Sequence, residues 1–186
     1  MILKRLMDIT LSLVVLVLAL PVFIIVPILI RRDGPGPVFY RQARVGRGGH
    51  VFQMLKYRSM VTNADKIGGH STAPGDARIT RIGAMLRKTS LDELPQLLNV
   101  LRGDMSLVGP RPDVPAQEKD YTPEEWRLRT SVLPGITGLA QATRRSEAAP
   151  GERKQLDLDY VARRSLALDF KILAMTVRQV LGRGGY

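Results

Sequence analysis

The stretch "ITLSLVVLVLALPVFIIVPILI", Ile9 to Ile30, contains no charged residue. As one helix it would extend roughly 33 Å, which is enough to cross the hydrocarbon core of a bilayer. It is too long for the apolar region of a signal peptide and has no good small-residue cleavage site. A buried helix of a soluble protein is the less favoured alternative at this length and apolarity. The stretch therefore predicts a membrane-associated helix.

Two features argue against a straight span. Pro21 lies near the middle of the run and removes a backbone hydrogen bond, so a bend is expected there, and Pro27 follows. Basic residues flank both ends of the run: Lys4, Arg5, Arg31 and Arg32. Because such residues favour the cytoplasmic side of a membrane, both ends are expected on that side. We predict a re-entrant membrane helix over residues 1–33, followed by one catalytic unit on the cytoplasmic face over residues 34–186.

The composition indicates anionic partners. Lys and Arg number 28 against 17 Asp and Glu, and the net charge is +11. Nucleic acid, a phospholipid surface or phosphorylated substrates would all suit this charge. An aromatic content of 5% weakens the nucleic-acid interpretation, because bases would find few rings to stack on. The absence of cysteine excludes a disulfide framework and a thiolate metal site.

The remainder of the chain predicts a mostly helical α+β fold. Residues 38–60 read as a β-hairpin with "GRGG" at its turn. Apolar residues at helical spacing predict further helices, some of them amphipathic and interfacial: 79–88, 90–103, 121–132 and 155–181. Arg111 lies in the proline-rich loop "LVGPRPDVP", and Gln141 ends the glycine-rich turn "LPGITGLAQ".

The segment "TSLDELPQLL", Thr89 to Leu98, places the adjacent acids Asp92 and Glu93 at the start of a predicted helix. A capping box of Ser90 and Glu93 is one interpretation. Asp92 as N-cap is preferred, because Pro95 then falls at the third helical position, where its missing N–H costs little. In either case the carboxylates would lie at the positive end of the helix dipole. A cap is the commoner role for such acids, and a reaction centre is the alternative.

The chain lacks a phosphate-binding P-loop, and "GRGG" does not have the spacing of a dinucleotide fingerprint. "DLDY" carries an acid pair, Asp157 and Asp159, but residues two apart on a helix point to nearly opposite sides. Asp92 and Glu93, several arginines and a membrane helix together suit transfer of a phosphoryl-type group on a lipid. A carboxylate can attack phosphorus to form an acyl phosphate, and Mg²⁺ is commonly held by one or two carboxylates plus phosphate oxygens.

Long motifs, in order along nearly the whole chain, give a specific resemblance. They are "KRLMD", "FYRQARVG", "KYRSM", "RKTSLDELPQLLNVLRGDMSLVGPRP" and "LPGITGLAQ". The chain resembles the bacterial sugar transferases of the monotopic phosphoglycosyl transferase family. The resemblance implies a re-entrant helix, interfacial helices and a helix-associated hairpin at the inner membrane of a bacterium. It also implies transfer of a sugar-1-phosphate from a UDP-sugar to a polyprenyl phosphate such as undecaprenyl phosphate, with release of UMP.

The same resemblance assigns roles to individual residues. Asp92 would be the nucleophile that forms a phosphosugar-aspartyl intermediate, and Glu93 would assist metal binding or activate the lipid phosphate. Both acids would hold Mg²⁺. The positions expected to face substrate are Lys56, Arg87, Arg111, Gln141 and Arg145. The sequence "ATRRS" around Arg145 departs from the "VNGRN"-like residues usual in the family, which bears on the sugar contacts.

Two other functions fit part of the sequence. A membrane-anchored basic protein that binds nucleic acid or anionic lipid without catalysis would explain the charge and the first helix, but not "SLDEL" or "GPRP". A transferase with a true membrane span and no covalent intermediate is the second alternative. Neither the sugar, the glycan pathway nor the oligomeric state follows from the sequence.

Overall fold

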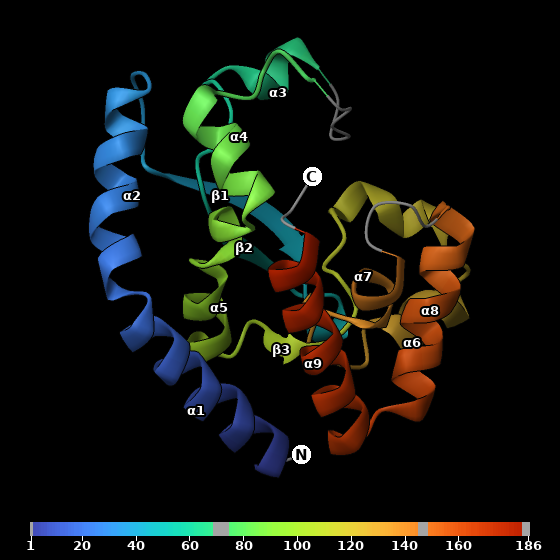
Figure 1. Cartoon of the computed structure of the whole chain (residues 1–186). Helices are drawn as coiled ribbons and strands as arrows, with labels where there is room; N and C mark the ends of the chain where they lie inside the picture. Colours follow the sequence, from blue (N-terminus) through green and yellow to red (C-terminus); the bar gives the residue numbers. More distant parts are fainter. Residues whose placement is uncertain (1, 69–74, 145–148, 184–186) are drawn as a thin grey trace.

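The computed structural model describes residues 2–68, 75–144 and 149–183. The fold is mostly helical with two small sheets, as the α+β prediction requires (Figure 1). The helices are α1 (Ile2–Leu18), α2 (Leu20–Arg32), α3 (Ala64–Ile67), α4 (Arg81–Lys88), α5 (Gln96–Arg102), α6 (Pro123–Arg129), α7 (Leu139–Arg144), α8 (Pro150–Arg163) and α9 (Leu166–Arg183). The strands are β1 (Phe39–Val45), β2 (Val51–Tyr57), β3 (Ser106–Val108) and β4 (Gly135–Thr137).

The apolar run forms two helices, α1 and α2, bent by 62° relative to each other. The break lies at Ala19, two residues before the predicted position, and Pro21 is the second residue of α2. Pro21 cannot donate to the carbonyl four residues earlier and its ring crowds that carbonyl, so the helix breaks ahead of it. Pro27 lies inside α2 without ending it. Among the described residues no single helix is long and apolar enough to cross a membrane, but this bent pair is, by length and composition.

The start of α1 is fixed to the rest of the molecule by polar contacts. Arg5 donates to the carbonyls of Val100 and Leu101, at 2.6 and 2.9 Å, in the last turn of α5. Lys4 forms an ion pair of 2.7 Å with Asp169 in α9. Buried Asp8 accepts hydrogen bonds from the Ser106 hydroxyl and the Leu107 amide, also buried.

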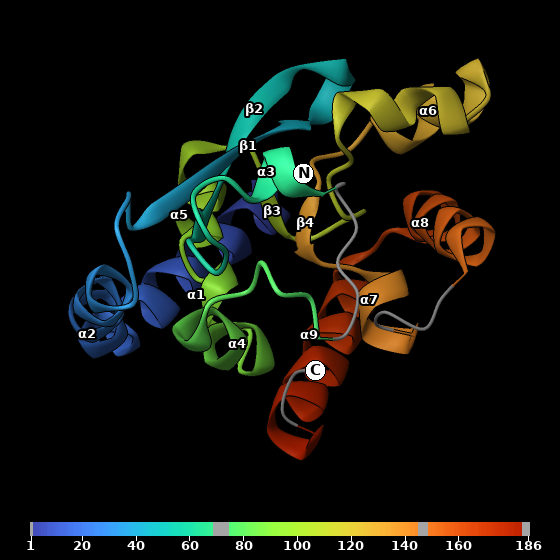
Figure 2. The same ribbon diagram turned by 90° about the horizontal axis from the view of Figure 1, so that it is seen from above.

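The end of α2 is fixed to the same body. The guanidinium of Arg58, just after β2, donates to the Ile30 and Gly34 carbonyls at 2.8 and 2.7 Å. Asp33 accepts from the Ile82 amide at 2.9 Å and so caps α4 from outside. Both ends of the apolar helix pair therefore lie against one domain, with α2 on the side of the molecule opposite α8 and the start of α1 near α9 (Figures 1 and 2).

The predicted hairpin is confirmed. β1 and β2 pair antiparallel from Phe39 opposite Tyr57 to Val45 opposite Val51, and the turn contains Gly48 and Gly49 at positive φ. Alternation along the strands places Lys56 and its opposite residue Tyr40 on one face, and Phe39 and Arg41 on the other.

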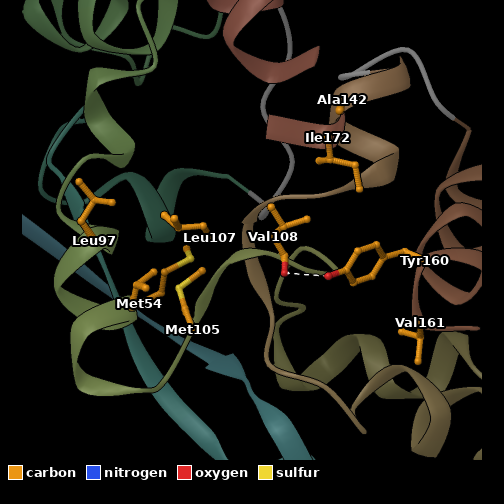
Figure 3. Packing of buried hydrophobic residues seen from close by; sticks show 10 residues of the cluster. Met54, Leu97, Met105, Leu107, Val108, Ala142, Tyr160, Val161 and Ile172 are labelled. Atoms are coloured by element: carbon orange, nitrogen blue, oxygen red, sulfur yellow. Dashed lines mark hydrogen bonds between the residues drawn. The ribbon is translucent and has the colours of Figure 1, made fainter. Parts of the chain in front are cut away.

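A parallel pair, β3 with β4, was not predicted. The glycine-rich segment 133–141, expected to be a turn, supplies β4 and the first residues of α7. Gly135 is needed there, because a Cβ would collide with the backbone of Gly109 and Thr137. The main core lies where this pair, the hairpin and α9 meet, and the Tyr160 hydroxyl donates to the Val108 carbonyl at 3.0 Å (Figure 3).

The predicted helices 79–88 and 121–132 correspond to α4 and α6, which are shorter than predicted, whereas the other two are divided differently. The segment 155–181 is divided into α8 and α9, because Ser165 caps α9 through its side chain, which accepts from the Leu168 amide at 3.2 Å. The segment 90–103 begins with a separate 3-10 turn, Leu91–Glu93, and α5 starts only at Gln96. Its predicted end at Gly103 is confirmed, with φ at 96°.

Candidate active site

Asp92 and Glu93 do not cap a helix, so both cap predictions are wrong. Pro95 occupies the N-cap position of α5, and no side chain caps that helix. Ser90 precedes the 3-10 turn in the left-handed conformation, with φ at 57° and no capping bond from its side chain. In a helix capped by Ser90, Pro95 would be the fifth residue and would lack the N–H needed there, so a separate turn that carries the two acids is favoured. Their carboxylates are thus left for other contacts.

Glu93 joins two cations from distant segments. Its Oε1 accepts from Lys56 Nζ at 2.7 Å and from Arg111 at 3.1 Å. Lys56 comes from β2 and Arg111 from the loop after β3. Burial favours a high pKa for Glu93, but these two cations outweigh it and hold the pKa well below its usual range. Burial also lowers the pKa of Lys56, and the Glu93 carboxylate opposes that shift.

Asp92 differs from its neighbour. It is only 8% exposed, yet no hydrogen bond or ion pair joins its carboxylate to any residue that the structure describes. Burial raises the pKa of Asp92 to about 6, Glu93 adds to the rise, and Lys56, Arg87 and Arg111 oppose it. Near neutral pH the site therefore presents a poorly solvated carboxylate within reach of positive charge. Such a perturbed acid is typical of a functional site.

Arg87 lies in the last turn of α4, and the segment that follows β2 holds its side chain. Its Nε donates to the Ser59 hydroxyl at 2.9 Å. Helix α4 approaches this segment closely at Gly83, where a Cβ would collide with the Ser59 backbone. The predicted role of Arg87 as a cation of the site is consistent with its effect on the Asp92 pKa.

The Arg111 loop is held by two further arginines that sequence reasoning did not single out. Arg44 donates to the Pro112 carbonyl at 2.7 Å, and Arg129 donates to the Arg111 carbonyl at 2.6 Å. Strand alternation places Arg44 on the same hairpin face as Lys56, and this signal could have identified it. Arg129 gives no such local signal, because its partners are far away in the sequence.

Gln141 lies in α7 rather than in a turn. Both polar atoms of its amide are buried and have no hydrogen-bond partner among the described residues. A Cβ on Gly138 would meet both this amide and the Gly109 carbonyl, so Gln141 lies near the start of the Arg111 loop.

Of the predicted site residues, the structure brings together Asp92, Glu93, Lys56, Arg87 and Arg111. Arg145 lies outside the described residues.

The two acids suit a hard cation. No cluster of three or more metal-binding side chains occurs in the described parts of the chain. Asp92 and Glu93 are adjacent, and Asp92 keeps its oxygens clear of ion pairs with described residues. Mg²⁺ commonly takes one or two carboxylates and completes its coordination with substrate phosphates and water. The predicted Mg²⁺ site therefore fits the donors present and stays a prediction.

The whole chain matches one protein family. The model of the family described as "Bacterial sugar transferase" covers residues 1–183. The chain is 40% identical over 185 residues to the UDP-glucose:undecaprenyl-phosphate glucose-1-phosphate transferase of Caulobacter vibrioides, covering 96% of the chain and 69% of that protein. It is 42% identical over 184 residues to an uncharacterized sugar transferase of Bacillus subtilis, covering 97% and 88%.

A third relative differs in its sugar. The chain is 38% identical over 183 residues to the UDP-N-acetylgalactosamine-undecaprenyl-phosphate N-acetylgalactosaminephosphotransferase of Aeromonas hydrophila, covering 96% of the chain and 43% of that protein. This longer relative extends well beyond the matched region. Taken with the acid and arginine cluster, the family match and the relatives show that the chain belongs to the bacterial sugar transferase family.

Proposed function

We propose that the protein transfers a sugar-1-phosphate from a UDP-sugar to a polyprenyl phosphate, releasing UMP, as an early membrane step in building a polysaccharide or other glycoconjugate. Two of the relatives are named as transferases that use a UDP-sugar and undecaprenyl phosphate. The observation that carries the proposal is the buried Asp92 carboxylate beside Glu93, Lys56 and Arg111. The relatives differ in their sugar, so the choice of sugar is left to experiment.

Asp92 is proposed as the nucleophile. One of its carboxylate oxygens attacks the phosphorus that bears the sugar, the bond from this phosphorus to the bridging oxygen breaks, and UMP leaves with the electron pair. An oxygen of the polyprenyl phosphate then attacks the same phosphorus and restores the Asp92 carboxylate. Division into two steps suits a buried carboxylate that the described residues leave unpaired.

Lys56, Arg87 and Arg111 would offset the charge on the transferring phosphoryl group. Bound Mg²⁺, held by Asp92 and Glu93, would supply further charge neutralisation on phosphate oxygens. Glu93 has two proposed roles, metal binding or activation of the lipid phosphate. Its lowered pKa favours the first, because a carboxylate that binds protons so weakly is a poor general base. Glu93 would also orient Lys56 and Arg111.

The proposed location is the cytoplasmic face of the inner membrane, with α1 and α2 dipping into one leaflet as a re-entrant pair. Both ends of the pair contact the same domain, through Lys4 and Arg5 at one end and Asp33 at the other. A broad apolar surface on the pair is exposed, including Leu13, Val17, Ile24 and Ile28.

Cysteine labelling tests this topology in a chain that has no cysteine. Single cysteines at Ile2 and at Arg32, both exposed, should react with a membrane-impermeant reagent only when the cytoplasmic side is open. Labelling of the Ile2 variant from the periplasmic side would establish a span and overturn the re-entrant placement.

Enzyme assays test the activity itself. Purified protein should release UMP from one member of a UDP-sugar panel when Mg²⁺ and polyprenyl phosphate are present, and should form a lipid-linked sugar diphosphate. Asp92→Asn should do neither. A protein that binds anionic vesicles but consumes no UDP-sugar would support the non-catalytic alternative.

A further inference from the structure

An open groove lies between the second membrane helix and the hairpin. Its volume is about 610 Å³, and its lining includes Pro27 and Arg31 of α2 and Val38, Phe39 and Arg41 of the hairpin segment. Phe39 stacks on Tyr57 with 5.4 Å between ring centroids, and Tyr57 packs in the smaller core with α2. The apolar wall of the groove is therefore backed by the hydrophobic core.

Two cations at the groove have no polar partner among the described residues. Arg31 and Arg41 are exposed, and neither forms an ion pair or hydrogen bond with a described residue. Other hairpin cations are engaged: Arg44 binds the Pro112 carbonyl and Lys56 binds Glu93. An apolar wall with two uncommitted guanidinium groups fits a ligand that has a phosphate and a hydrocarbon chain.

The groove is separate from the candidate active site. Phe39 and Arg41 project from the hairpin face opposite to the one that carries Lys56. Tyr40, which also lines the groove, lies on the Lys56 face, and the two sites share no residue. A lipid phosphate held at Arg41 would lie on the hairpin face opposite to Lys56.

The groove is continuous with the surface proposed to enter the membrane. Ile24, Ile25 and Ile28 of α2 are 65%, 53% and 48% exposed, and Arg31 follows in the last turn of the helix. In a re-entrant pair this last turn lies at the depth of the headgroups. A chain held beside the isoleucines would place its phosphate at Arg31 and, across the groove, at Arg41.

We propose that this groove binds one anionic phospholipid, its phosphate between Arg31 and Arg41 and an acyl chain against Val38, Phe39 and Pro27. The bound lipid would hold α2 to the hairpin at the membrane surface without taking part in transfer. This proposal rests on the proposed membrane placement, but not on the reaction at Asp92.

Native mass spectrometry tests it on the full chain in detergent micelles doped with phosphatidylglycerol. Wild type should retain one phosphatidylglycerol, and the double variant Arg31→Gln, Arg41→Gln should bind it about 30-fold more weakly. The matched control is Arg47→Gln, Arg127→Gln, which removes the same charge from two other exposed positions and should bind as wild type does. UMP release by both double variants should stay close to that of wild type.

Equal loss in both double variants would show diffuse attraction to a basic surface and overturn the proposal. The proposal would also be overturned if wild type retained no phosphatidylglycerol, or if the Arg31→Gln, Arg41→Gln variant retained it as well as wild type does. Equal binding of phosphatidylcholine would overturn it too. Preferential retention of polyprenyl phosphate over phosphatidylglycerol would replace the proposed occupant by the acceptor substrate. Failure of the lipid assay in a protein that still releases UMP removes this site alone, whereas an inactive protein that retains the lipid argues against the reaction alone.

Discussion

Two clusters of acids and arginines lie side by side in this protein, and they differ in how completely the structure encloses them. In the first, Arg129 forms ion pairs with Asp113 at 2.9 Å and Asp157 at 2.8 Å, and its side chain is 4% exposed. In the second, Glu93 pairs with Lys56 and with Arg111, whose side chain is 35% exposed. Arg129 connects the two by donating to the Arg111 carbonyl.

The difference separates a cluster that joins helices from the cluster that we propose as the reaction site. Arg129 links α6 to α8 and to the Arg111 loop, and the Tyr121 hydroxyl adds a bond of 2.8 Å to Asp113. Asp157, part of the "DLDY" segment, is thus occupied by Arg129, whereas Asp159 accepts from Gln155. The two acids therefore have different partners, on different sides of α8. Asp92 forms no corresponding ion pair with any described residue.

The largest effect on stability is expected at Arg129. Arg129→Met leaves Asp113 and Asp157 buried without their cation and should lower the free energy of unfolding by about 3–5 kcal/mol. Urea unfolding in detergent measures this. Arg127→Met, on the exposed side of α6, is the control and should cost under about 0.5 kcal/mol. An Arg129→Met protein as stable as the control would mean that the enclosed cluster does not hold these helices together.

The largest effect on activity outside Asp92 is expected at Glu93. Glu93→Gln keeps the size of the side chain but removes the charge that places Lys56 and Arg111. Turnover should fall by about 100- to 1,000-fold. The unfolding free energy should also fall, by about 1–3 kcal/mol and less than in Arg129→Met, because mostly buried Lys56 loses its counter-charge. Steady-state kinetics and urea unfolding check both parts, with Glu124→Gln on exposed α6 as the control. An active but strongly destabilised Glu93→Gln protein would mean that Glu93 serves the fold rather than the reaction.

Substitution of Arg111 tests whether a guanidinium, with its pair of parallel N–H donors, is needed to bind the phosphate. Arg111→Lys keeps the charge but has one nitrogen in place of the planar guanidinium, so turnover should fall by about 10- to 100-fold with folding unchanged. Arg47→Lys in the hairpin turn is the matched substitution and should be silent. Wild-type kinetics in the Arg111→Lys protein would show that charge alone suffices at this position.

The smallest effect is a pH-dependent gain in stability. The pKa of Asp92 rises from its ordinary value of 3.8 to about 6 in the folded protein, so its ionisation costs folding free energy as the pH rises through this range. Asp92→Asn removes that cost. The variant should be more stable than wild type by about 1–3 kcal/mol at pH 8, and the gain should vanish below about pH 3, where Asp92 is protonated in both the folded and the unfolded protein.

Urea unfolding over this pH range, with exposed Asp120→Asn as a reference, measures the gain. Lower stability of Asp92→Asn at pH 8 would indicate that Asp92 supports the fold after all.

Local sequence signals predicted the local structure well. The hairpin follows from alternation and "GRGG", and the end of α5 follows from Gly103. The apolar run and Pro21 predicted a bent helix pair to within two residues. The parallel pair β3 and β4 was missed, because strands of three residues are too short to show alternation and their pairing is long-range.

Part of the candidate site was predicted, mainly through the family resemblance. The resemblance, rather than any spacing rule, assigned Lys56, Arg87 and Arg111 to the acids, and the structure brings these residues together. The helix-cap interpretation was wrong because Pro95 starts α5 late and leaves the acids in a separate turn. Ser59 and Arg129 make their contacts across the fold, and no local pattern marks those contacts. Arg44 could have been identified, because strand alternation places it on the Lys56 face.

The proposed mechanism requires a covalent bond between Asp92 and the sugar phosphate, and intact-mass spectrometry can detect it. Enzyme mixed with Mg²⁺ and the UDP-sugar it turns over, without polyprenyl phosphate, should gain the mass of one sugar phosphate and release about one UMP per enzyme. Peptide mapping should locate the adduct at Asp92, added polyprenyl phosphate should remove it, and Asp92→Asn should never form it. Release of UMP only when the lipid is present, with no adduct at any time, would contradict the account and support direct transfer.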